Sequence, residues 1–258
     1  MAVDDTKRLG YGGSAEIASK QVLITSGGFA TAEAPSYLEP WSIPPSQVSR
    51  SRILHADGTE AYTGELSLDV TDNFLDVLTT STLMGRRYQF DVGINDGEDA
   101  EVMSDCFLTS MSLSGAPGGL VTASLSFISA SEAQSSIGVA NDFIRDDEPL
   151  GYWYSGNTDV REWTLTMNQA AEPAYRNENS KAPRYIKVGL VDYSLSVTTF
   201  DAIVAHSTIN IKTRTFTLTG VTTSSGYSFA GVTDLGVYQH TFDTAAAAAS
   251  GSGGIIIT

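Results

Sequence analysis

The side chains that most often catalyse reactions or bind metals are sparse in this 258-residue chain. The histidines are His55, His206 and His240, and the single cysteine is Cys106. No histidine has a second histidine, a cysteine or a glutamate at the spacing of a zinc site. Cys106 stands in the apolar stretch DCFLTS, which favours a buried structural thiol over a nucleophile. We therefore expect no enzyme activity, no metal and no cofactor.

Two kinds of motif resemble ion-binding or phosphate-binding sequences without meeting their requirements. The stretch NDGEDAE (95–101) crowds acidic residues, but it lacks the residue order of a calcium loop, and Asn-Asp-Gly is typical of a hairpin turn. GYGGS (10–14) and SGSGG (250–254) are rich in glycine, yet neither is expected between a strand and a helix, as a phosphate loop requires. We interpret them as a turn and two flexible ends.

The charge of the chain excludes several classes of partner. It has 30 acidic and 15 basic residues, for a formal net charge of −15. A conventional nucleic-acid binder needs a basic stripe, and docking on anionic lipid needs clustered Lys and Arg.

No apolar run is long enough to span a membrane, and the N-terminus lacks the apolar segment of a signal peptide. A lone cysteine also excludes an intrachain disulfide.

The dominant pattern is an alternation of apolar and polar residues, which predicts strands with one buried face. It recurs, among other stretches, over 21–25, 65–70, 88–94, 111–114, 121–129, 162–167, 185–190, 193–200, 214–221 and 238–242. Helical signals are few. The best covers 71–85, with Asp72 or Asn73 as the cap, Phe74, Leu75 and Leu78 on one stripe, and Gly85 as the stop. A shorter helix is expected over 200–207. The predicted fold class is therefore mainly β, with a short helix in each half.

The two halves of the chain share an order of elements: strand, long loop, strand, short helix, further strands. Residues 20–37 and 161–175 each hold a strand, then Ala, Glu, Pro and Tyr in nearly the same order. We expect the loops to cover roughly 35–60 and 173–184. The sequence thus predicts an N-terminal arm (1–19), a first domain (20–130), a linker (131–151), a second domain (152–243) and a flexible C-terminal tail (244–258).

The polar faces of the expected strands have an unusual composition. In ELSLDV (65–70) the residues opposite the leucines are Glu65, Ser67 and Asp69, and the other strands carry Ser and Thr there, with almost no Lys or Arg. Two interpretations remain open. The faces are either ordinary solvated strand faces or the lining of a channel that must not bind its cargo.

Duplicated β domains with this order of elements resemble the tail tube proteins, or major tail proteins, of long-tailed bacteriophages. The resemblance rests on QVLITSGGFATAEAPSYLEP (21–40) and on the unit from EWTLTM (162–167) to YSLSVTTF (193–200). It covers about 130–243, and less clearly 15–130. The first half has no close counterpart to KAPRYIKVG (181–189), and the final IIIT (255–258) has no expected place.

The resemblance implies two tandem β-sandwich or half-barrel domains, each with a short flanking helix. In that family, neighbouring subunits join into a continuous β-barrel, and chains with two such domains form trimeric rings of pseudo-sixfold symmetry. The expected lumen-facing residues are Glu65, Ser67, Asp69, Asp91, Ser124, Ser126, Glu162, Thr164, Ser194, Ser196, Thr215 and Thr217. The residues expected in loops that contact the next ring are Pro35, Tyr37, Pro44, Pro45, Arg50, Arg52, Pro173, Tyr175, Arg176, Lys181, Pro183 and Arg184.

The function implied is that of a virion structural protein, made in the bacterial cytoplasm and assembled into the tail. Its expected partners are further copies of itself, tail tip and terminator proteins, and DNA and the tape measure protein in passage, with no membrane. A Ser/Thr lining with acidic residues repels phosphate, as a DNA conduit requires. The alternatives are a tail terminator, hub or capsid decoration protein, or a carbohydrate-binding β-sandwich using Trp41, Trp153, Tyr11 and Tyr152.

Overall fold

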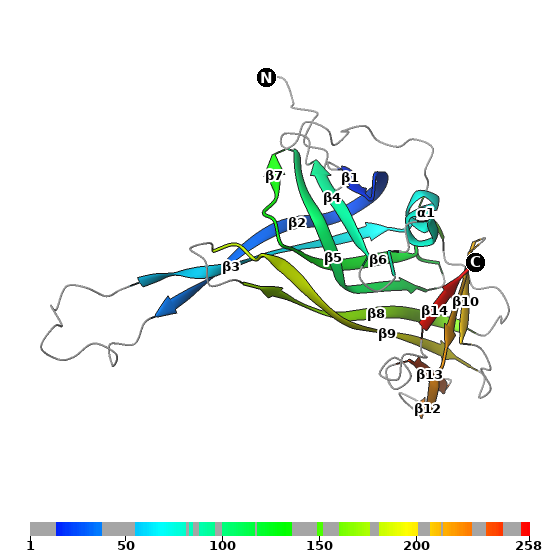
Figure 1. The fold of residues 1–258 in the computed structure, drawn as a ribbon. Helices are drawn as coiled ribbons and strands as arrows, with labels where there is room; N and C mark the ends of the chain where they lie inside the picture. Colours follow the sequence, from blue (N-terminus) through cyan, green and yellow to red (C-terminus); the bar gives the residue numbers. More distant parts are fainter. Residues whose placement is uncertain are drawn as a thin grey trace, which may run out of the picture.

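A computed structural model gives the arrangement of the chain (Figure 1). It describes residues 14–37, 55–80, 83–84, 88–95, 100–116, 118–135, 149–151, 160–175, 181–200, 207–212, 214–228, 236–244 and 254–258. These residues form strands and a single helix, which confirms the mainly β class. The elements are β1 (Ser14–Ile17), β2 (Lys20–Tyr37), β3 (His55–Asp69), α1 (Asp72–Thr80), β4 (Gln89–Asn95), β5 (Ala100–Gly115), β6 (Thr122–Ser129), β7 (Gln134–Ser135), β8 (Val160–Ala174), β9 (Tyr185–Thr199), β10 (Thr208–Ile211), β11 (Arg214–Thr219), β12 (Thr222–Ser228), β13 (Val237–Asp243) and β14 (Gly254–Ile257).

Strands of the first half close into a six-stranded antiparallel barrel in the order β5-β4-β1-β2-β3-β6, with β6 paired back to β5. The short strand β1 closes it, because it pairs with β2 on one side and β4 on the other. Ala18 and Ser19 make the β1–β2 turn, both with positive φ (50° and 64°), as a tight hairpin requires. Ser14–Ile17 were expected in an N-terminal arm and instead form a barrel strand.

The second half extends the same sheet. The first part of β5 pairs with β4, and from Ser110 onward the strand pairs with β8 instead. Beyond β8 follow β9, β13 and β12. A separate three-stranded sheet holds β10, β11 and β14. Gly254–Ile257 were expected in a flexible tail, whereas this β-branched run pairs with β11.

The strand order of the first half is repeated in the second. The run β2-β3-β6-β5 corresponds to β8-β9-β13-β12, with every pair antiparallel. The single strand β5 corresponds to two strands in the second half, β11 followed by β12. Accordingly, β4 and β7 pair with β5, whereas β10 and β14 pair with β11. The division into two tandem domains is not confirmed, because β8 pairs directly with β5 and both halves contribute to one sheet.

Helix α1 covers one end of the barrel (Figure 1). Its cap is Thr71, whose hydroxyl accepts a hydrogen bond from the amide of Phe74 at 3.3 Å, not Asp72 or Asn73 as expected. Phe74, Leu75 and Leu78 are buried, as their spacing predicts. The expected stop, Gly85, and most of the expected second helix lie outside the described residues.

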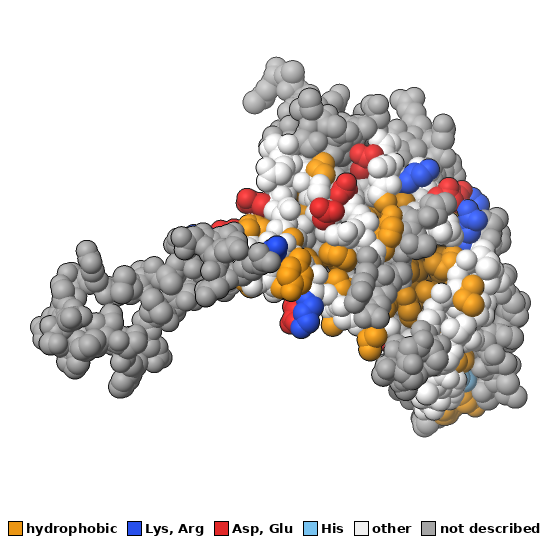
Figure 2. Space-filling view, viewed as in Figure 1, with side chains coloured by type: hydrophobic (Ala, Val, Ile, Leu, Met, Phe, Trp, Pro, Cys, Tyr) orange, Lys and Arg blue, Asp and Glu red, His pale blue; other side chains and the backbone are white. Residues whose placement is uncertain are grey.

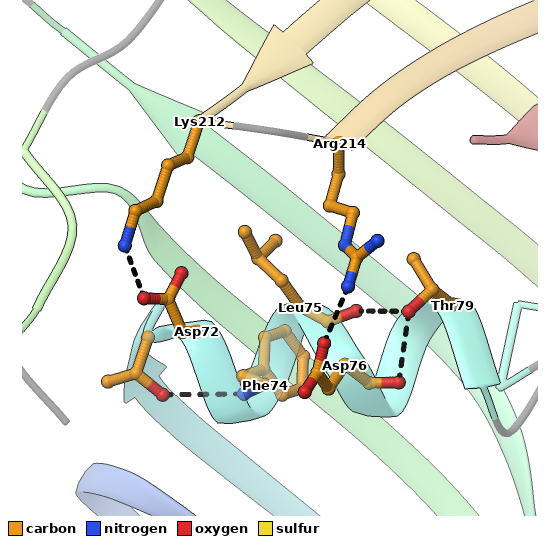
Figure 3. Close-up of polar contacts among 8 residues, drawn as sticks. Asp72, Phe74, Leu75, Asp76, Thr79, Lys212 and Arg214 are labelled. Carbon is orange, nitrogen blue, oxygen red and sulfur yellow. Dashed lines mark hydrogen bonds and ion pairs between the residues drawn. The ribbon is translucent and has the colours of Figure 1, made fainter.

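Two ion pairs join this helix to the β10–β11 hairpin of the second half (Figure 3). Lys212 pairs with Asp72, and Arg214 Nη2 lies 2.7 Å from Asp76 Oδ1. The hydroxyl of Thr79 donates to the carbonyl oxygens of Leu75 and Asp76. The helix of the first half is therefore tied to the small sheet of the second.

Both ends of the loop expected over 35–60 are strands, as is the start of the loop expected over 173–184, and residues 38–54 and 176–180 lie outside the described residues. β2 runs to Tyr37, which pairs with His55 at the start of β3, so that His55 is not in a turn. Pro35 sits at an irregularity of β2, and Pro173 lies in β8 beyond the part that pairs with β5, both places where a strand tolerates proline. The β2–β3 hairpin projects from the barrel as a long arm (Figure 1).

Candidate functional site: a hydroxyl-lined sheet face

The registers of the main sheet place polar residues from consecutive strands in continuous rows on one face. One row crosses seven strands through Ser67, Ser124, Ser112, Thr166, Ser194, Asp243 and Thr222. The rows on either side hold Glu65, Ser126, Ser110, Asn168 and Asp192, and Asp69, Thr122, Ser114, Thr164, Ser196, Thr241 and Ser224. A further row holds Glu162, Thr198, Gln239 and Gly226. We call the surface made by these rows the hydroxyl face.

The opposite face of the same strands is apolar and buried, which fixes the orientation of the hydroxyl face. A single row there holds Leu68, Ala123, Leu113, Leu165, Leu195 and Phe242, all at most 4% exposed. Because side chains alternate along a strand, a slip of one residue in any pair would bury hydroxyls and expose leucines. The apolar core therefore holds the polar residues in register.

The hydroxyl face is neutral to acidic. Its rows contain five carboxylates, those of Glu65, Asp69, Glu162, Asp192 and Asp243, and neither lysine nor arginine. The basic side chains coloured in Figure 2 lie in small separate groups and form no continuous stripe among the described residues on that side of the molecule. Such a face offers weak hydrogen bonds and no cation to hold a phosphate.

Neighbouring side chains of the face bond to one another. Ser114 and Thr122 hydroxyls lie 3.0 Å apart, and the Thr198 hydroxyl donates to Glu162 at 3.1 Å. The amide of Gln239 donates to the Ser196 hydroxyl at 3.2 Å. These contacts use hydrogen-bonding capacity within the face. Fewer donors and acceptors are therefore left to bind another molecule.

Most of the residues expected to line a lumen are brought together on this face. They are Glu65, Ser67, Ser124, Ser126, Glu162, Thr164, Ser194 and Ser196, and each is exposed or half-buried. Asp69 shares a row with Thr122 but is only 6% exposed, and burial raises the pKa of its carboxyl. Whether this face lines a channel stays a prediction.

Three of the expected lumen residues lie elsewhere. Asp91 is on β4, in the barrel wall, where its Oδ1 accepts a hydrogen bond from the Asp105 amide at 3.0 Å. Thr215 and Thr217 are on β11, in the small sheet. Alternation alone identified them as polar strand residues, and it cannot tell one sheet from another.

The sequence-based set missed the centre of the face. Ser110, Ser112 and Ser114 lie on β5, which connects the strands of the first half to β8. The available signal was the alternation of serine with Met111 and Leu113. What the sequence could not supply was the position of this strand between β6 and β8.

The residues expected to contact a neighbouring ring divide into three groups. Pro44, Pro45, Arg50, Arg52 and Arg176 lie outside the described residues. Pro35, Tyr37 and Pro173 are in strands, as described above. Tyr175, Lys181, Pro183 and Arg184 lie in the β8–β9 connection, where the Tyr175 hydroxyl donates to the Glu60 carbonyl at 2.7 Å and the Glu60 amide donates to the Lys181 carbonyl at 2.9 Å. These contacts tie the β8–β9 connection to the β2–β3 arm.

The described part of the chain offers little else that resembles a chemical site. It holds no group of three or more His, Cys, Asp or Glu that could bind a metal. Cys106 is fully buried, burial raises the pKa of its thiol, and its Sγ donates to the Met103 carbonyl. His206 lies outside the described residues, as do Trp41, Trp153, Tyr11 and Tyr152.

A serine and a histidine do meet on β12 and β13. Ser225 Oγ lies 2.8 Å from His240 Nδ1, a distance compatible with a nucleophile and its base. His240 is 2% exposed, however, and stands on the apolar side of the sheet opposite Val197. We interpret the contact as one that satisfies a buried imidazole.

No protein-family model matches the chain, and no curated protein sequence matches it. None of the helical residues that the structure describes forms a segment long and apolar enough to cross a membrane.

Proposed function

We propose that this chain is the subunit of a phage tail tube: copies close into rings, the rings stack, and the hydroxyl face lines the channel through which DNA passes. The observation that carries the proposal is the hydroxyl face itself, which continues across both halves of the chain with carboxylates and no basic residue. A conduit needs such a wall, because each lysine or arginine would add an attractive contact to phosphate and retard the cargo.

The repeated strand order supports the finer architecture. β2-β3-β6-β5 and β8-β9-β13-β12 are the two tandem tail-tube-like units, and three chains supply the six units of a pseudo-sixfold ring. The β2–β3 arm and the β8–β9 connection reach the next ring. Tail tip and terminator proteins bind the ends of the tube, and the tape measure protein and DNA occupy its channel. The chain acts without catalysis or cofactor, as part of the virion.

Negative-stain electron microscopy of the concentrated protein tests this proposal. We expect stacked rings with a central hole, and threefold or pseudo-sixfold symmetry in averaged end views. Single rings that never stack would favour the terminator or hub alternative. Failure to form any ring or tube across a wide range of concentration and salt would count against the proposal.

Gold labelling tests which face lines the channel. In a Ser112→Cys variant, a thiol-reactive gold particle should lie on the axis of assembled tubes, because Ser112 is in the middle of the hydroxyl face. The matched control is Gln89→Cys, an exposed position on β4. Gold on the outer wall for Ser112→Cys would exclude the hydroxyl face as the lining.

A further inference from the structure

The junction of the two halves is a strand pair inside the chain. β5, the last strand of the run β2-β3-β6-β5, pairs antiparallel with β8, the first strand of the run β8-β9-β13-β12. The pairing extends from Ser110 opposite Asn168 to Gly115 opposite Trp163. The β5–β8 pair therefore shows, within one molecule, how the last strand of one run pairs with the first strand of another.

The outer end of the second run has no such neighbour. Among the described residues β12 pairs with β13 alone, and all seven residues of β12 are exposed. The side of β12 that faces away from β13 therefore meets no other strand of the described chain. A strand that is exposed along its full length is a template for pairing with another chain.

The outer edge of the first run is open in a matching place. β2 pairs with β1 only from Lys20 to Val22, and past Ile24 that side of β2 meets no other strand of the described chain. Residues 26–30 of β2 and 63–67 of β3 line a hollow of about 440 Å³. One side of β5 shows the same change of neighbour inside the chain. Its first part pairs with β4, and from Ser110 onward that side pairs with β8.

Neither edge carries the features that keep edge strands apart. Residues 222–228 of β12 are TTSSGYS, and residues 24–32 of β2 are ITSGGFATA, without a charge or a proline in either segment. Monomeric β proteins usually protect such edges with lysine, proline or an inward-pointing charge. The absence of these features from both segments is typical of strand edges that pair with a further strand.

The repeated registers fix which residues of the two edges correspond to the internal junction. We align ELSLDV of β3 (65–70) with SLSVTT of β9 (194–199), so that Glu65 corresponds to Ser194. On β8, Thr166 faces Ser194, and on β2, Gly28 faces Glu65, which makes Gly28 the counterpart of Thr166.

On their other side, the aligned strands β3 and β9 pair with β6 and β13. Leu125 faces Leu66, and Phe242 faces Leu195, so Leu125 and Phe242 correspond. The residues opposite them are Met111 on β5 and Thr223 on β12, which makes Ser224 the counterpart of Ser112. Since Ser112 faces Thr166 inside the chain, Ser224 should face Gly28.

We propose that β12 of one copy pairs antiparallel with β2 of the next copy, with Ser224 opposite Gly28, Thr222 opposite Ala30 and Gly226 opposite Ser26. This inference rests on the proposed function for its partner, a second copy of the chain, and adds the strands and the register. The pairing continues the rows of the hydroxyl face across the subunit boundary with small residues only. Gly28 has no atom within 4 Å of where a Cβ would stand, so a side chain fits there.

Disulfide cross-linking tests this register. In the variant Gly28→Cys/Ser224→Cys, opposite Cβ atoms of neighbouring copies come within about 4.5–5.5 Å, close to what a disulfide needs. We expect oxidation of the assembled protein to give covalent oligomers on non-reducing gels, ending at one size if the ring closes. Ala32→Cys/Ser224→Cys keeps the same edges but moves one thiol about 13 Å along the strand, and should yield roughly tenfold less product.

Further controls establish the folded state. Ser112→Cys/Thr166→Cys places the two thiols at the internal junction and should oxidise within single chains without forming oligomers. Each single-cysteine variant should give no product beyond a dimer. The native Cys106 stays in place, because it is fully buried.

The outcomes separate this inference from the proposed function. Rings or tubes that form but do not cross-link through Gly28→Cys/Ser224→Cys, or that cross-link equally through the Ala32→Cys pair, would overturn the register and leave the tube subunit standing. Specific cross-linking into open chains without rings or tubes would support the strand pair and count against the tube. Absence of both assembly and cross-linking, with the internal pair oxidised, would overturn both.

Discussion

The two halves of this chain share a strand order, yet among the described residues only the first closes a barrel. In the first half, β5 continues unbroken from its partner β4 to its partner β6, and β1 bridges β4 to β2. In the second half, the corresponding stretch is interrupted at Gly220, whose φ of 67° turns the chain between β11 and β12. β11 then joins β10 and β14 in a separate sheet, and β12 remains at the edge of the main one.

Closure of the first half uses two local features, an uninterrupted long strand, β5, and a short hairpin strand, β1, at its N-terminal side. Where both are present, the first half closes a barrel, and on its outer edge the part of β2 past Ile24 pairs with no further strand of the described chain. Where the long strand is interrupted, at Gly220, the same order of pairing leaves β12 paired with β13 alone among the described residues. In the proposed strand pair, the half that stays open supplies β12, and the half that closes supplies the outer part of β2.

The largest effect is expected where the halves join. Trp163 is 1% exposed and lies against Gly115 of β5, so Trp163→Ala should lower the free energy of unfolding by about 3–5 kcal/mol. The counterpart of Gly115 on the open edge is Tyr227, which is 57% exposed, and Tyr227→Ala should cost less than about 1 kcal/mol in the monomer. Urea unfolding at low protein concentration measures both. Similar losses at the two positions would contradict the contrast between closed junction and open edge.

Trp163→Phe is the matched control for volume. The indole N–H of Trp163 is buried without a hydrogen-bond partner among the described residues. Replacing the indole removes the free-energy cost of burying this unsatisfied donor. That gain offsets part of the cost of the small cavity that phenylalanine leaves. The loss should therefore be clearly smaller than for Trp163→Ala.

The sequence was sufficient for those features that depend on local alternation. It predicted most of the strands, the buried stripe of α1 and the shared polar face of residues such as Ser67 and Thr164. It could not place Thr215 and Thr217 in a different sheet, because a period of two is the same in any sheet. It also treated Pro35 and Pro173 as loop markers, although an irregular or unpaired strand edge accommodates them.

Long-range pairing was the other part that the sequence could not supply. The direct contact of β5 with β8 joins segments from the two halves, and no local pattern specifies that partner. The same holds for IIIT at the C-terminus: its β-branched residues indicate a strand, but its position beside β11 depends on tertiary packing.

A smaller effect is expected from the ion pair that ties α1 to the second half. Arg214 and Asp76 are both more than a third exposed, so a double-mutant cycle with Arg214→Ala and Asp76→Ala should give a coupling of about 0.2–1 kcal/mol. Added salt should reduce it. The control pair, Lys187 and Glu172, joins neighbouring strands within one half at 70% and 67% exposure, and its coupling should be smaller. A larger coupling for the control pair than for Arg214 and Asp76 would contradict this ranking.

The smallest effect concerns a position where the halves differ in charge. Asp69 is buried at the end of β3, and its counterpart in the second half is Thr198, which has no titratable group. Burial raises the pKa of Asp69 above its ordinary value of 3.8, so the folded protein holds this proton more tightly than the unfolded chain does. The corresponding stability is fully present below the unfolded pKa and is lost as the pH rises through the folded pKa.

Asp69→Asn should remove this pH dependence. Relative to the unsubstituted protein, the variant should gain stability on going from acidic to neutral pH, because asparagine has no charge to bury. Urea unfolding over a pH series gives the slope. Ser67→Ala alters a neighbouring polar residue without a titratable group, and it should keep the original profile. If Asp69→Asn lost stability relative to the original protein as the pH rose, its carboxylate would be a stabilising charge, and the two halves would differ at this position for a reason other than burial.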